Sequence, residues 1–355
     1  MLRVVALGLA LAFVAACAQQ TTTAPAPAPE TVDPTTEYND GLADEQAGDY
    51  FAAADHFTVS AGQNYAPAQY ELGKLHERGD GVIRDMSTAA SFYEASANGG
   101  YVPAQNRIGD LYHRGLGVSR DSKKAAHYWR LAAEAGDADA QAKLGFAYEN
   151  GIGVPFSFED AAVWYRRAVD QDHYGAAVNL ARLYHSGQGV PKNYESAAIL
   201  YQKAASGGEV DAMYRLGHLY ANGLGVPQSY GIAFEWWTQG SRGGDPASMT
   251  SLGQAYHDGL GVPIDHDAAM SWWHKSADLS NADGMIALGS HYSESNVVHH
   301  DRARSYHYYT LAIGVLSIGP KRDEVNFTRN SLGRVMTGAE LERAQNLSAA
   351  WLASR

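Results

Sequence analysis

The 355-residue sequence contains a single cysteine, Cys17, and has fewer basic than acidic side chains. One cysteine excludes a framework of intrachain disulfides and a zinc site built from several thiolates. With 27 lysines and arginines against 39 aspartates and glutamates, the formal net charge is −12. Nucleic-acid binding depends on basic contacts to phosphates, so no nucleic-acid partner is expected. Motifs typical of hydrolases, metalloproteases, P-loops and EF-hands are also missing, and we predict no catalytic residue and no cofactor.

The first 16 residues are typical of an export signal. Arg3 supplies a positive charge, and the apolar run 4–15 that follows has the length of a signal core and is too short to span a bilayer. Val14-Ala15-Ala16-Cys17 then resembles the lipobox of bacterial lipoproteins, in which the cysteine becomes the acylated N-terminus. We therefore expect a signal peptide at 1–16 and a lipid anchor at Cys17. An ordinary signal peptide with a cysteine placed by chance is the alternative.

The residues after Cys17 bear on where the protein is held. Residues 17–36 are rich in threonine, alanine and proline, which favours an extended tether without a core of its own. Lipoproteins retained at the bacterial inner membrane often carry aspartate after the cysteine, where this sequence has Ala18. The resemblance therefore implies the outer membrane, with the periplasmic face preferred over the cell surface.

A period of 36 residues dominates the rest of the chain. Its first marker is a glycine after an aliphatic residue, replaced by alanine in the fourth copy: Gly73, Gly109, Gly145, Ala181, Gly217, Gly253 and Gly289. A G-x-G-V segment begins six residues after this marker in six of the copies. An aromatic residue follows the marker by 20 residues in all seven copies: Tyr93, Trp129, Tyr165, Tyr201, Trp237, Trp273 and Tyr309. Three markers that share one period indicate a repeat architecture.

Each repeat predicts two helices joined by a glycine turn. Apolar residues fall at helical spacing on both sides of the G-x-G-V segment. This segment is expected to end the first helix, because glycine adopts the left-handed conformation of a helix C-cap. Asp85 and Asp121 stand where they can cap the second helix. The marker glycine costs the first helix about 1 kcal/mol relative to alanine. We therefore expect a neighbouring helix to approach closely there, with tyrosines three residues later, such as Tyr112, completing an interlocking seam.

The combined pattern is similar to the Sel1-like repeat, a relative of the tetratricopeptide repeat. It reads A-x-x-x-L-G-x-L-Y-x-x-G-x-G-V followed by A-A-x-x-Y/W. The resemblance implies an all-α fold, a right-handed α-solenoid of about seven repeats over residues 67–318, in which each repeat contacts mainly its neighbours. A looser tetratricopeptide-like helix pair is expected at 37–66. Capping helices are expected at 319–355, including a closing helix from Met336 to Trp351.

Histidine and tryptophan are the residues that most invite a ligand. His113, His185 and His257 share one repeat position in alternate repeats. Positions two repeats apart on a solenoid are too distant to share one ion, so exposed or hydrogen-bonded histidines are the simpler interpretation and no metal site is predicted. The region around His299, His300 and His307 is a further metal candidate, with the same simpler interpretation as the alternative. Sugar stacking is the alternative for the tryptophan pairs at 236–237 and 272–273, which we interpret mainly as core.

A partner is expected on the concave face, which solenoids commonly use for binding and which first helices usually line. The variable positions of the first helices lie three before, one after and four after the marker. From these positions the candidate partner-binding residues are Tyr70, Lys74, Asn106, Asp110, His113, Phe146, Glu149, Arg182, His185, Tyr214, His218, Gln254 and His257. Their mixed polarity favours a protein or peptide over a small molecule, and an ordinary solvated face is the alternative.

These features together predict a non-enzymatic scaffold, lipid-anchored at the bacterial cell envelope, that binds another envelope protein or a peptide. Lipoproteins with such repeats also occur in exopolysaccharide secretion complexes of the outer membrane, and that role is the alternative. A third reading is a hydrolase, because one branch of the family is linked to β-lactam binding and hydrolysis. That branch carries a disulfide in each repeat, and this sequence lacks the cysteines.

Overall fold

The computed structural model describes residues 33–294 and 300–354, and their regular secondary structure consists of eighteen α-helices. The expected signal peptide, Cys17 and most of the expected tether lie outside the described residues, as does His299. Within the described ranges, no helix is both long and apolar enough to cross a membrane.

Most of the helices have nearly the same length. In chain order they are α1 (Pro34–Ala47), α2 (Tyr50–Gly62), α3 (Ala66–Arg78), α4 (Met86–Asn98), α5 (Val102–Arg114), α6 (Ser122–Glu134), α7 (Ala138–Asn150), α8 (Phe158–Val169), α9 (Tyr174–Ser186), α10 (Tyr194–Ser206), α11 (Val210–Asn222), α12 (Tyr230–Arg242), α13 (Pro246–Asp258), α14 (His266–Asp278), α15 (Ala282–Ser293), α16 (Arg302–Val315), α17 (Pro320–Val335) and α18 (Gly338–Ala353).

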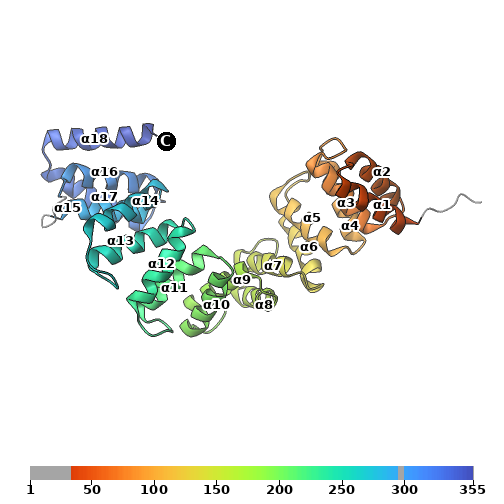
Figure 1. Ribbon diagram of the computed structural model, residues 1–355, viewed down its shortest axis with the longest axis horizontal. Helices are drawn as coiled ribbons and strands as arrows, with labels where there is room; N and C mark the ends of the chain where they lie inside the picture. The colour runs from red at the N-terminus through yellow and green to blue at the C-terminus, as the bar shows by residue number, and fades with distance from the viewer. Residues whose placement is uncertain (1–32, 295–299, 355) are drawn as a thin grey trace, which may run out of the picture.

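The helices form a curved stack of pairs. From α1 to α16, each odd-numbered helix packs most closely against the even-numbered helix that follows it, and each pair then packs on the next. Figure 1 shows the pairs following one another along an arc, with α1 and α2 in one arm and α18 at the end of the other. Among the described residues, helix pairs that are far apart in the sequence therefore do not share a common core. This arrangement confirms the predicted all-α solenoid of paired helices.

The two glycines of the G-x-G turn are required for different structural reasons. The first ends its helix in the left-handed conformation, as Gly79 does with φ 84°, and Asp85 then accepts a hydrogen bond from Ser87 N at 2.9 Å. The second glycine meets the preceding pair, because a Cβ on Gly81 would lie 2.1 Å from the carbonyl oxygen of Tyr50 at the start of α2. The caps confirm the sequence analysis, whereas the contact of the second glycine was not predicted.

The marker glycines allow a close approach between helices, as predicted. A Cβ on Gly145 would lie 2.7 Å from Tyr165 Cδ1, and one on Gly253 would lie 2.3 Å from Trp273 Nε1. The expected partner was wrong, however. The aromatic marker of the paired second helix fills this space, while Tyr112 stacks on Tyr128 at 6.0 Å. The seam thus lies within each helix pair, between the glycine of the first helix and the aromatic marker of the second helix.

The two ends of the solenoid are closed differently. At the N-terminal end, a Cβ on Gly41 of α1 would lie 2.7 Å from Phe57 of α2, so this pair has the same seam without the repeat pattern. At the C-terminal end, α18 packs against α16. The predicted closing helix begins two residues later than expected, because Thr337 forms a capping box with Glu340. Ala344 is its fully buried residue.

Candidate binding surface

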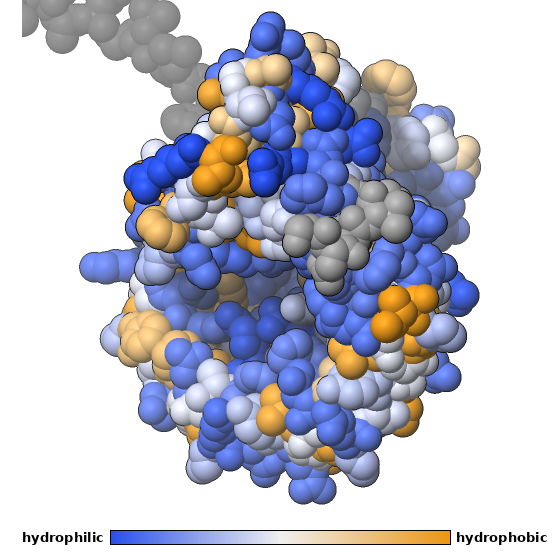
Figure 2. Space-filling model, turned by 90° about the vertical axis from the view of Figure 1, so that its left-hand side faces the viewer, coloured by the Kyte–Doolittle hydropathy of each residue, from blue (hydrophilic) through white to orange (hydrophobic). Residues whose placement is uncertain are grey.

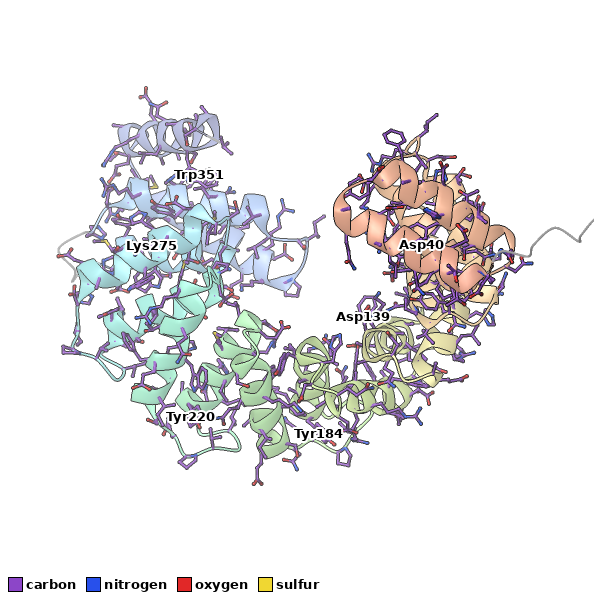
Figure 3. The ribbon with its side chains drawn as sticks, turned by 45° about the vertical axis from the view of Figure 1, so that its right-hand side comes forward. Asp40, Asp139, Tyr184, Tyr220, Lys275 and Trp351 are labelled. Carbon is purple, nitrogen blue, oxygen red and sulfur yellow. The ribbon has the colours of Figure 1, made fainter. Side chains whose placement is uncertain are left out.

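The arc encloses a hollow on its inner side. Figure 2 looks into this hollow and shows walls that are largely hydrophilic, and Figure 3 places Asp139, at the start of α7, on the inner side. Several of the predicted partner-binding residues line cavities between neighbouring first helices. The structure therefore groups the predicted stripe into separate local sites, each made by two or three successive repeats.

One of these cavities, of about 340 Å³, lies between α5, α7 and α9. Phe146 is 44% exposed at its wall. Asp110 accepts hydrogen bonds from Trp129 Nε1 at 3.1 Å and from Lys143 Nζ at 2.8 Å. The cavity thus combines an exposed aromatic ring with a fixed ion pair, an arrangement suited to a peptide that has both an apolar and a charged or polar group.

A histidine that the sequence analysis missed lines the same cavity. His173, the N-cap residue of α9, accepts a hydrogen bond from Ala176 N at 3.0 Å through Nδ1, and its Nε2 lies 3.7 Å from Asp139 Oδ1. The neighbouring Asp139 carboxylate raises the pKa of His173, and His173 in turn holds the pKa of Asp139 well below its usual range. The cavity can therefore gain a positive charge on mild acidification. The signal in the sequence was the position of a histidine directly before a first helix.

A second, smaller cavity lies where α9 and α11 meet. Its lining includes the predicted residues His185, Tyr214 and His218, together with Arg215. Burial lowers the pKa of His185 and raises the pKa of Tyr214, so both are favoured in their neutral forms. Arg215 is held by Asp211, with Nε 2.7 Å from Oδ2. This cavity offers neutral hydrogen-bonding groups beside one neutralised cation.

Comparison with protein families identifies the repeat directly. The Sel1 repeat model matches seven consecutive segments: residues 66–101, 102–137, 138–173, 175–209, 210–245, 246–281 and 282–313. The chain belongs to the Sel1 repeat family. The first segment begins with α3, so the pair formed by α1 and α2 and the helices α17 and α18 lie outside the matched repeats.

Two crystal structures resemble large parts of this chain. One is a protective antigen present in uropathogenic Escherichia coli strains that displays an SLR fold; it is 28% identical, has a TM-score of 0.75, and the match covers 90% of this chain and 69% of that one. The other is a Sel1 repeat protein from Oxalobacter formigenes, 28% identical with a TM-score of 0.60, where the match covers 68% of this chain and 96% of that one. A comparison with the curated proteins found no match. The Sel1 chain is thus a repeat scaffold of a kind typical of protein-binding adaptors.

Some predicted partner-binding residues of the Sel1 scaffold are engaged within the protein. Glu149 is only 8% exposed, and it accepts hydrogen bonds from Tyr165 Oη at 2.7 Å and from Arg182 Nη2 at 2.5 Å. Lys74 pairs with Glu71 on its own helix. Glu149 and Lys74 therefore form bonds within the solenoid, and only some of the predicted partner-binding residues are available to a partner.

Other predicted residues keep exposed or half-buried positions along the stripe. Asn106 donates hydrogen bonds to Asp137 at 3.0 Å and to Asp139 at 2.9 Å. Gln254 is exposed and donates to Asp258 at 2.6 Å. Tyr70 is half-buried, with its ring 5.4 Å from that of Tyr93. The exposed residues of the predicted set, Phe146, His218 and Gln254, therefore all lie in the third repeat or later.

The three equivalent histidines line three different cavities, in keeping with the separation expected from the repeat. His113 lies beside Trp129, His185 beside Tyr194, and His257 beside Trp273. The structure nevertheless brings His257 close to two other histidines, a cluster that the sequence analysis did not predict. The tryptophan pairs behave as expected for core residues: Trp237 and Trp273 are buried, and Trp236 and Trp272 are half-buried.

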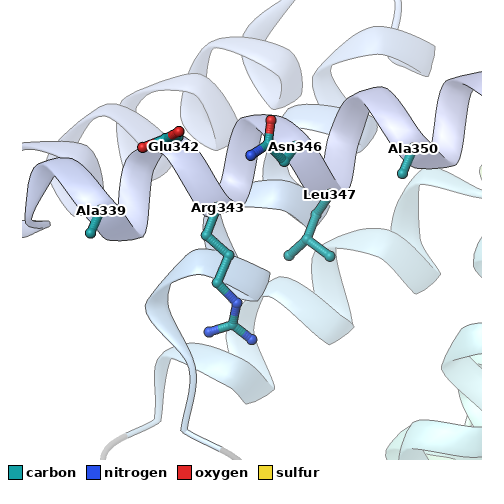
Figure 4. A pocket seen from close by; sticks show the side chains of 6 residues that line it. All are labelled: Ala339, Glu342, Arg343, Asn346, Leu347 and Ala350. Atoms are coloured by element: carbon teal, nitrogen blue, oxygen red, sulfur yellow. The ribbon is translucent and has the colours of Figure 1, made fainter.

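A shallow depression on α18 is unlike the inner-face cavities. Figure 4 shows that all six of its lining residues come from this one helix: Ala339, Glu342, Arg343, Asn346, Leu347 and Ala350. Arg343 is engaged by Asp301, with Nη2 2.8 Å from Oδ2. A surface of one helix cannot enclose a ligand, so we do not place the functional site here.

Proposed function

We propose that this Sel1 protein is a non-enzymatic scaffold of the bacterial cell envelope, anchored by acylation of Cys17 and binding a protein or peptide along the inner face of its solenoid. The observation that carries the proposal is the cavity between α5, α7 and α9, where exposed Phe146 adjoins the pair formed by Asp110 and Lys143. Such a site favours an extended segment with one apolar anchor flanked by polar groups.

Repeat architecture supports a partner that spans several cavities. Neighbouring first helices contribute successive cavities along the same face, so one extended segment can occupy more than one of them. Binding several weak sites on one chain increases the overall affinity without any single deep pocket. The polar walls in Figure 2 are consistent with a partner that binds transiently rather than as a permanent subunit.

Site-specific crosslinking in the native envelope tests the binding face. A photoreactive phenylalanine analogue is placed at Phe146, and in a matched variant at Ile199, which is 64% exposed on α10. We expect a discrete crosslinked partner from position 146, and its loss when Lys143→Glu reverses the charge beside Asp110. Equal crosslinking from both positions, or insensitivity to Lys143→Glu, would overturn the proposed face.

Membrane fractionation tests the anchor separately. Changing Cys17 to alanine should move the folded protein from the membrane fraction to the soluble periplasmic fraction, because the acyl chains provide the lasting attachment. Separation of inner and outer membranes then tests the sorting expected from Ala18. Unchanged membrane partition of the Cys17→Ala protein contradicts the lipid anchor without affecting the binding face.

A further inference from the structure

Three histidines from three successive helices converge between the sixth and seventh repeats. His257 lies in the last turn of α13, His266 is the first residue of α14, and His291 lies in the last turn of α15. One ring nitrogen of each lies within 4.8 Å of the corresponding nitrogens of the other two. The site is well protected, since His291 is 1% exposed and the other two are half-buried.

The rings are spaced as the ligands of one small metal ion. With metal–nitrogen bonds of about 2.0–2.1 Å and tetrahedral angles, ligating nitrogens lie about 3.4 Å apart and ring centroids about 5 Å apart. Here the centroids of His257 and His266 are 5.0 Å apart, and those of His291 are 5.5 Å and 5.6 Å from them. The nitrogens therefore need to close by at most about 1.4 Å to reach tetrahedral separations.

A neighbouring carboxylate orients one of the rings for ligation, and a second ring has an unbonded nitrogen. His257 Nδ1 lies 2.9 Å from Asp258 Oδ1, so this bond directs the lone pair of Nε2 inward, and Nε2 is buried without a hydrogen bond. A carboxylate on the second nitrogen of a ligating histidine is the usual support for a metal site. His266 Nδ1 is likewise buried without a hydrogen bond. The indole of Trp273 does not compete, because its Nε1 donates to Thr250 O at 3.1 Å.

A carboxylate lies next to one of the three histidines. Glu294 Oε2 lies 3.5 Å from His257 Nε2. Glu294, His257 and His291 also line a cavity of about 280 Å³ that extends toward Gln254 and Asp283. The cavity gives an ion access from solvent, and it leaves room for a water molecule or a ligand from another protein.

We propose that His257, His266 and His291, with Glu294 as the fourth ligand, form a binding site for a divalent transition metal, zinc in particular. Three imidazoles and one carboxylate suit zinc, whereas magnesium and calcium take oxygen ligands. The ion joins α13, α14 and α15, and so it adds a link between two repeats that otherwise meet through packing and hydrogen bonds, such as the one between Tyr308 Oη and His274 Nδ1 at 3.1 Å. Zinc at this place stiffens the C-terminal part of the arc.

Zinc titration of the full chain, freed of any affinity tag and stripped with a chelator, tests the site. We expect one equivalent of zinc by calorimetry, and a rise in melting temperature of a few degrees at saturating zinc. Cobalt in place of zinc should give the intense visible absorption of a tetrahedral ion. Absence of stoichiometric zinc binding, together with no tetrahedral cobalt spectrum, would overturn the proposal.

Matched variants locate the ion. His266→Gln and His257→Gln should each weaken zinc binding by at least about 100-fold, and Asp258→Asn by about 10-fold through the loss of ring orientation. His113→Gln, at the repeat position of His257 but two cavities away, should bind like the wild type. Circular dichroism of the zinc-free proteins checks that each variant is folded. Wild-type affinity in both His266→Gln and His257→Gln would disprove the assignment, even if zinc binds elsewhere on the chain.

Discussion

The third and sixth repeats share one seam but differ in the last turn of their first helices. In both, an aromatic ring from the second helix fills the space beside a glycine, Gly145 in one and Gly253 in the other. Four residues later, the third repeat has Glu149, which is satisfied by a tyrosine and an arginine of its own chain. The sixth repeat has His257 there, and this histidine faces two more imidazoles and a carboxylate. The framework is thus constant, while the residue at this variable position, together with its neighbours at other positions, determines whether the end of the helix is closed by internal bonds or presents an imidazole to other histidines.

The largest effect is expected from the shared seam. Gly145→Val and Gly253→Val should each lower the free energy of unfolding by about 3 kcal/mol or more, because even a Cβ at these positions meets a buried ring. Gly314→Val is the matched control, since a Cβ on this helical glycine meets nothing within 4 Å. Chemical denaturation measures all three. A loss within experimental noise at either seam position would show that the two seams are not equivalent.

Acidification should separate the C-terminal cap from the middle of the solenoid. Burial and His274 lower the pKa of His307 to about 4 from 6.5, and His307 bonds to Ser348 of α18. The unfolded chain binds the proton more readily, so stability falls as pH drops from about 6.5 to 4, by roughly 3 kcal/mol at most. Protection factors of the α18 amides, which correct each observed exchange rate for the intrinsic rate at that pH, should therefore be lower at pH 4.5 than at pH 7. His307→Gln should remove this difference, and an unchanged pH dependence of the protection factors in that variant contradicts the mechanism.

His173 should respond with the opposite sign. The nearby Asp139 carboxylate raises its pKa in the folded protein. The stabilisation is therefore fully present below pH 6.5 and is lost as pH rises through the folded pKa. The proton enters at Nδ1, which accepts from Ala176 N in the neutral ring, so the readout is the titration of the imidazole itself. An NMR titration should give His173 a pKa above 6.5, while Asp139 stays ionised because its own pKa is lowered. Asp139→Asn should return the pKa of His173 toward 6.5, and an unchanged pKa in that variant would contradict the contrast with His307.

A moderate effect on stability is expected at Glu149, which the third repeat holds with internal hydrogen bonds. Glu149→Gln keeps the shape but loses the charge-assisted bonds to Tyr165 and Arg182, at a cost of about 1–2 kcal/mol. His257→Gln in zinc-free protein should cost less, because the imidazole has one hydrogen-bonded partner, Asp258. Glu134→Gln, on an exposed position of α6, is the control. Thermal and urea unfolding compare the three, and a reversed order would mean that the histidine cluster is the tighter structure without metal.

The smallest effect on stability is expected at the proposed binding face. Phe146→Ser should change the free energy of unfolding by no more than about 0.5 kcal/mol, since the ring is 44% exposed. The same variant should lose partner crosslinking from neighbouring positions. A loss of stability as large as that of Glu149→Gln would place the ring in the core and remove it from the proposed site.

Sequence periodicity was sufficient to predict the helix pairs, their caps and the close approach at the marker glycines. It could not identify which ring fills the seam, because Tyr112 and Trp129 both follow Gly109 at plausible spacing and only packing distinguishes them. For the site, the period pointed to Phe146 and Asp110 as partner-binding residues; both line one cavity, and their binding role stays a prediction. It also grouped His257 with distant equivalents, whereas its actual neighbours lie at other repeat positions.

The contact of the second turn glycine has a consequence for how such a chain can change in length. Gly81, Gly117 and Gly153 each rest on the opening backbone of the preceding even-numbered helix, and backbone is the same whatever the side chains are. Each unit of 36 residues therefore supplies the glycine that contacts the preceding unit, whatever the side chains of that unit are. Duplication or deletion of whole units can lengthen or shorten the arc while these contacts between units are kept. The length of the solenoid can therefore evolve independently of the residues that determine partner specificity.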